Sequence, residues 1–81
     1  MNKTRAKKLN KFVGQLESML EVVQEQLDGE QESYEKLSEK AQESEKGQES
    51  SAAISELEQA LQSIEEAKDA IENAISSIEL D

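Results

Sequence analysis

Hydrophobic side chains recur every seven residues along two long stretches of the chain. In the first stretch, one row is Leu9, Leu16, Val23, Glu30 and Leu37, and the second is Val13, Leu20, Leu27, Tyr34 and Ala41. The rows are offset by three and four residues, which places them on one stripe of an α-helix. Phe12 and Met19 widen this stripe near the start of the chain. We therefore predict a helix over residues 4–37.

The second stretch has the same periodicity and a distinct row on each flank. Its apolar rows are Ile54, Leu61, Lys68 and Ile75, and Leu57, Ile64, Ile71 and Ile78. One flank carries Ala53, Ala60, Ala67 and Ala74, and the other carries Glu58, Glu65, Glu72 and Glu79. Small side chains let another helix approach, and glutamates are typical of a solvated edge. A second helix is predicted over residues 45–79.

A polar segment separates the two stretches, because residues 42–51 contain no apolar side chain. We place the turn at about residues 38–50, with Ser38 capping a short terminal turn and Ser44 or Ser50 capping the second helix. Gly29 makes a local kink plausible within the first helix. A short connection between long helices predicts an all-α, antiparallel two-helix hairpin, similar to a coiled coil, as a single domain over residues 1–81.

One hairpin offers only a small core. Below about 80 residues a core rarely supplies more than ~3–5 kcal/mol, and the absence of Cys and His excludes disulfides and zinc sites. We therefore expect two copies to form a four-helix bundle. Full overlap with the turns at opposite ends sets Glu30 level with Lys68 of the second copy, which predicts an ion pair that fixes the register. The alternative is that both side chains reach solvent from the edge of the seam.

Charge is unevenly distributed along the chain, whose 9 basic and 19 acidic residues give a net charge of −10. Five basic residues lie within the first 11 positions, and the other 70 hold 4 basic and 19 acidic residues, a net −15. An acidic body repels nucleic-acid phosphate and anionic lipid, so we expect neither duplex nucleic-acid binding nor membrane binding. It can attract a basic protein surface, although acidity that only maintains solubility is the simpler interpretation.

No residue pattern indicates catalysis, a cofactor or a metal site. The carboxylates fall on regular outer helix faces, whereas an acid–base pair needs a cleft with two distinct environments. The segment around Gly29 also lacks the ligand spacing of a calcium loop. We therefore predict that the chain is not an enzyme.

A small basic corner is the one candidate ligand site. Full overlap in the dimer brings the basic start of one copy near residues 34–50 of the other. The candidate residues are Arg5, Lys7, Lys8, Lys11, Tyr34, Lys40, Ser44 and Lys46. Tyr34 would stack on a nucleotide base and Arg5 would bind a phosphate. In the alternative interpretation, Tyr34 is a core residue and the lysines pair with glutamates of the second helix.

The segment from Glu32 to Lys46, with the basic start from Lys3 to Lys8 and the Leu/Ile/Ala/Glu-rich second helix, resembles small acidic helical-hairpin accessory proteins of bacteriophages. In those proteins an aromatic residue precedes a Pro-Glu break, followed by Gln and a Ser-Glu-Lys or Ser-Glu-Arg sequence. Ser38 stands where that family often has Pro, which predicts that the first helix runs further here. The resemblance implies a phage accessory protein in the cytoplasm of an infected bacterium.

Three functions follow from these features. The favoured one is a stoichiometric, non-catalytic inhibitor of a host factor in counter-defence or host takeover, which blocks a host protein with its acidic helical surface. The second is an oligomeric sponge that sequesters a nucleotide immune signal at the basic corners between subunits. The third is a structural coiled-coil element of a phage assembly.

Overall fold

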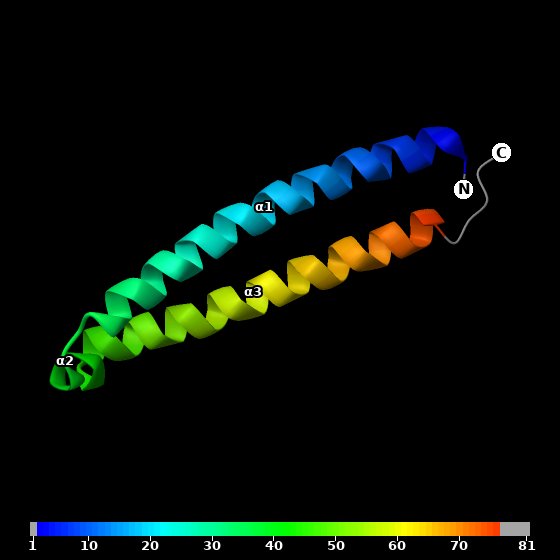
Figure 1. Cartoon of the computed structure of the whole chain (residues 1–81). Coiled ribbons are helices and arrows are strands. Elements are labelled where there is room, and N and C mark those ends of the chain that lie inside the picture. Colours follow the sequence, from blue (N-terminus) through cyan, green and yellow to red (C-terminus); the bar gives the residue numbers. More distant parts are fainter. Residues whose placement is uncertain (1, 77–81) are drawn as a thin grey trace.

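The chain forms a helical hairpin in the computed structural model, which describes residues 2–76 (Figure 1). Its elements follow in the order α1 (Lys3–Glu35), α2 (Glu39–Glu43) and α3 (Glu45–Ser76). The long helices α1 and α3 lie side by side and run in opposite directions, and the short α2 sits at their connected end. The described residues contain no strand, so the prediction of an all-α hairpin is confirmed.

The hairpin is long and thin, with principal extents of 62 × 15 × 13 Å and a radius of gyration of 18.1 Å. A compact chain of 81 residues would have a radius of gyration of about 12 Å. The accessible surface is 6192 Å², whereas a compact monomer of this mass exposes about 4,900 Å². The single chain therefore leaves much more surface in water than a globular protein of its size.

The core is a single narrow seam between α1 and α3. Within residues 2–76, the buried hydrophobic residues of this seam all come from α1, and they are Ala6, Val13, Leu16 and Leu27. The facing apolar residues of α3, such as Leu57 and Ile64, are only half-buried. Two paired helices cover each other from one direction only, so the apolar seam side chains of α3 stay partly accessible.

Side-chain caps define where the helices begin. Asn2 Oδ1 accepts a hydrogen bond from the Arg5 backbone N–H at 2.9 Å, at the start of α1. Ser38 Oγ accepts from the Ala41 N–H at 3.2 Å, at the start of α2. Ser44 Oγ accepts from the Gly47 N–H at 3.2 Å, at the start of α3. The predicted caps at Ser38 and Ser44 are therefore confirmed, and Ser50 lies inside α3.

The structure corrects the predicted end of the first helix. α1 stops at Glu35 rather than at residue 37 or beyond, because Ser38 has an extended backbone (ψ 161°) and starts a new helix. The chain has reversed by Ser44, so the turn is shorter than the predicted residues 38–50. Gly29 does not interrupt α1. The predicted end of the second helix at residue 79 lies outside the described residues.

Candidate binding surfaces

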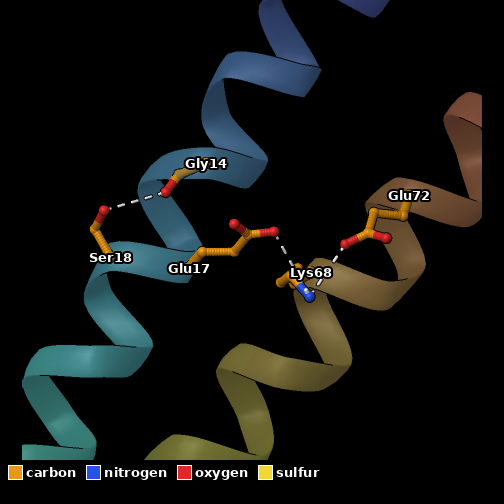
Figure 2. Close-up of polar contacts among 5 residues, drawn as sticks. All are labelled: Gly14, Glu17, Ser18, Lys68 and Glu72. Atoms are coloured by element: carbon orange, nitrogen blue, oxygen red, sulfur yellow. Dashed lines mark hydrogen bonds and ion pairs between the residues drawn. The ribbon is translucent and has the colours of Figure 1, made fainter.

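One long side of the hairpin is acidic. Lys68 Nζ lies 3.2 Å from Glu72 Oε1 on α3 and 4.0 Å from Glu17 Oε1 on α1 (Figure 2), so the rows through these two glutamates border the seam on the same side. Gln24 and Glu65, from the same two rows, line one shallow groove. We call this the acidic side, and its rows are Asn10, Glu17, Gln24 and Gln31 of α1 and Ser51, Glu58, Glu65 and Glu72 of α3.

The opposite long side carries no carboxylate in the two rows that border the seam. Ser33 of α1 and Lys46 of α3 line one groove, which places their rows together. We call this the apolar side, and its rows are Arg5, Phe12, Met19, Gln26 and Ser33 of α1 and Lys46, Ala53, Ala60, Ala67 and Ala74 of α3. Helical spacing gives the flanks of each helix separately, so it does not show by itself that the alanine row lies beside Phe12 and Met19. The sequence feature that could have indicated this pairing is that neither row contains a carboxylate.

Large hydrophobic side chains lie exposed along the apolar side. The exposed fractions are 45% for Phe12, 50% for Met19 and 58% for Val22. Met19 and Val22 line a cleft of about 310 Å³ together with Ser18 and Val23. A run of exposed apolar side chains on a small protein is typical of an interaction surface.

The two charged residues of the seam have partners within the chain. Ser50 Oγ donates a hydrogen bond to Glu30 Oε1 at 2.8 Å, which links α3 to α1. Lys68 contacts Glu72 and Glu17, and the hydrogen bond and charge of Glu72 raise the pKa of Lys68 above its usual value, with a smaller contribution from Glu17. The pair between Glu30 and Lys68 of two copies stays a prediction.

The candidate residues of the basic corner fall into two groups at opposite ends of the hairpin. Arg5, Lys7, Lys8 and Lys11 lie on the exposed first turns of α1, at the open end. Tyr34, Lys40, Ser44 and Lys46 lie around the turn, with Tyr34 half-buried. Within residues 2–76, no carboxylate is at ion-pair distance from the four basic groups of α1. One chain alone therefore does not bring the predicted site together.

Two of these residues, Ser44 and Lys46, line a groove of about 320 Å³ at the turn. The groove also contains Glu30, whose carboxylate opposes anion binding, along with Ser33, Leu37, Ala41 and Ser50. A lone lysine beside a carboxylate provides little net positive charge for a phosphate.

The turn depends on Gly47, which is buried near the start of α3. A Cβ atom at this position would collide with the carbonyl oxygens of Ala41 and Gln42, because the end of α2 rests against α3 there. Gln42 Nε2 also donates to the carbonyl oxygens of Tyr34, at 3.1 Å, and Leu37, at 3.4 Å. A glycine three residues after a capping serine was the available signal for this close approach.

The part of the chain that the structure describes contains no group of three acidic side chains placed to hold a metal ion. None of its helices has an apolar stretch long enough to span a bilayer.

No protein family, curated protein or solved structure matches the chain. The resemblance to phage accessory proteins stays a prediction.

Proposed function

We propose that the chain is a non-catalytic binding protein that presents its acidic side to a basic surface of another protein. The observation that carries this proposal is the separation of charge across the hairpin. Glu17, Glu58, Glu65 and Glu72 share one side, and the rows on the other side contain no carboxylate. A long surface of one sign steers a partner of opposite charge and fixes its orientation.

In this proposal the binding form is a homodimer arranged as a four-helix bundle. The thin seam and the large accessible surface of one chain support association with a second copy. If the resemblance to phage proteins holds, the target is a host protein, blocked at a surface that otherwise holds nucleic acid. Such a role fits counter-defence or host takeover.

Neutralising glutamates on one side at a time tests the function. Glu58→Gln with Glu65→Gln removes two exposed charges from the acidic side, and Glu49→Gln with Glu56→Gln removes two from exposed α3 positions outside its rows. Both variants have the same net charge. We expect only the first to weaken binding to immobilised polylysine, by tenfold or more. Equal losses would mean that net charge alone governs binding, which contradicts the proposal.

Nucleotide sequestration is the second candidate, and Ser44 and Lys46 in the turn groove are the observation that favours it. It requires Arg5 and Lys8 of a second copy to reach that groove, and hence a dimer with its turns at opposite ends. Native mass spectrometry of protein purified from bacterial cells, repeated after denaturation, tests it. A nucleotide-sized mass that is lost on denaturation would favour sequestration over protein blocking.

A further inference from the structure

We propose that the apolar side is the interface between two copies, which pack with their turns at the same end. In this arrangement Phe12, Met19 and Val22 of each copy lie over the alanines of α3 in the other. The inference rests on the dimer of the proposed function and adds which surface forms it and in which orientation.

A ridge and a furrow lie next to each other on this surface. The ridge is Phe12, Met19 and Val22 on α1, which are 45–58% exposed. The furrow is Ala60, Ala67, Ala70 and Ala74 on α3, of which Ala67 and Ala70 are exposed and the others half-buried. Both features occupy the open half of the hairpin.

Two contacts between the helices establish that the ridge and furrow are level. Glu17 reaches Lys68, and Glu30 accepts a hydrogen bond from Ser50. Continuing this register towards the open end sets Phe12 level with Asn73 and Ala74 of α3. The large side chains of α1 therefore lie alongside the small side chains of α3, over the same part of the hairpin.

This surface is complementary to itself under a twofold axis that runs along the hairpin. Such an axis places α1 of each copy over α3 of the other, so each ridge enters the other furrow and the same contact forms twice. Neighbouring helices then run in opposite directions, as in an up-down four-helix bundle. Large residues opposite small ones fill the layer between the hairpins without voids.

The opposite orientation gives a poorer match. With the turns at opposite ends, a twofold axis across the hairpin places α1 over α1, and full overlap sets Phe12 and Met19 opposite polar residues such as Ser33 and Gln26. Side-chain size therefore favours the orientation with the turns at the same end.

The accessible surface is large enough for such an interface. One chain exposes 6192 Å², roughly 1,300 Å² more than a compact monomer of its mass. A stable interface of standard size covers about 800 Å² on each partner. Between residues 60 and 74, the α3 positions that would be covered are Ala60, Ser63, Ala67, Ala70 and Ala74. None of these positions carries a carboxylate, so covering them buries no unpaired negative charge.

Engineered cysteines test the orientation, because the chain has no cysteine of its own. We expect a mixture of Gln15→Cys and Ala70→Cys chains to form a covalent dimer on oxidation. Gln15 and Gly29 of two copies would be close only if the turns lay at opposite ends. We therefore expect a mixture of Gln15→Cys and Gly29→Cys chains to remain uncrosslinked. All three positions are exposed. Crosslinking of the second mixture instead of the first would overturn the proposed orientation.

Analytical ultracentrifugation tests the surface. The wild-type chain is expected to sediment at twice its mass of 9.0 kDa, and Met19→Lys is expected to raise the dimer Kd at least tenfold. The matched control Ser55→Lys adds the same charge at an exposed position outside the apolar side, and its Kd should change less than twofold.

The outcomes separate this inference from the proposed function. A wild-type monomer would contradict both the interface and the dimer of the proposed function. A wild-type dimer that Met19→Lys and Ser55→Lys leave equally intact would contradict the interface alone. Binding to polylysine through the acidic side is measured independently of either result.

Discussion

The turn end and the open half of the hairpin are built from the same helices but held together in different ways. At the turn, Gly47 lets α2 rest on α3, Gln42 donates to two carbonyl groups, and Ser50 links to Glu30. In the open half, a narrow seam and the 4.0 Å contact between Lys68 and Glu17 connect α1 to α3. The turn satisfies its polar groups within one chain, whereas the open half leaves a hydrophobic surface uncovered.

This difference indicates what each region needs from its surroundings. Directional hydrogen bonds and a close backbone contact specify the turn without a partner. A seam between two helices gains its stability from burial, and burial in the open half is incomplete while Phe12 and Met19 remain about half exposed. The following substitutions and pH changes test the turn and the open half separately. All free energies of unfolding refer to one fixed protein concentration, because dimerisation shifts the apparent stability.

Truncating the seam should have the largest effect. Leu16 is 7% exposed, and Leu16→Ala is expected to lower the free energy of unfolding by about 3 kcal/mol, through lost burial and a cavity. Urea unfolding followed by far-UV circular dichroism measures it. The matched control is Leu37→Ala, at a position that is 38% exposed, where less than half that loss is expected. Equal losses would show that the seam is not the main source of stability.

Blocking the close contact at the turn should have the next largest effect. Gly47→Val forces side-chain atoms into the carbonyl groups of α2, and the expected loss is about 2 kcal/mol. Gly29→Ala is the control, because nothing lies near its added Cβ, and it should stabilise α1 by about 0.5–1 kcal/mol. Destabilisation by both substitutions in the same unfolding experiment would contradict this account of the turn.

Removing a helix cap should have a smaller effect. Ser44→Ala leaves the Gly47 N–H without its hydrogen bond at the start of α3, and the expected loss is about 1 kcal/mol. Hydrogen exchange of the Gly47 amide should accelerate. Ser51→Ala, at an exposed position inside α3, is the control and should leave this exchange rate unchanged.

The pH dependence of the ion pair should be the smallest effect. Glu72 raises the pKa of Lys68 above its usual 10.5. The stabilisation is therefore fully present at neutral pH and is lost as the pH rises through the folded pKa. An NMR titration of Lys68 should give a pKa above 10.5, and Glu72→Gln should lower it more than Glu17→Gln. A larger effect of Glu17→Gln would mean that contact across the helices dominates.

Much of the fold was predictable because periodicity and capping are local. Rows such as Leu9–Leu16–Val23 define one helix stripe, and Ser38 and Ser44 precede helices as capping residues commonly do. The end of α1 at Glu35 was not predictable from these rows, since Leu37 continues the periodicity beyond it. The break arises because Ser38 starts α2, and α2 is held by contacts with α3.

The candidate site was less predictable than the fold. The sequence identified the basic residues but grouped Arg5 with Lys46, which lie at opposite ends of the hairpin. Their grouping depended on an assumed orientation of a second copy. The exposed ridge of Phe12 and Met19 was visible as a widening of the apolar stripe, because helical position follows directly from residue spacing.

The sequence by itself determined two long amphipathic helices, their seam, their caps and the surplus of acidic charge, since each depends on spacing along one helix. Only the tertiary structure decided the close approach at Gly47, the bond of Glu30 to Ser50 and the contact of Lys68 with Glu17. Periodicity fixes the direction in which a side chain leaves its own helix. It does not fix the longitudinal register between two helices. The turn sets this register, and every contact between the helices depends on it.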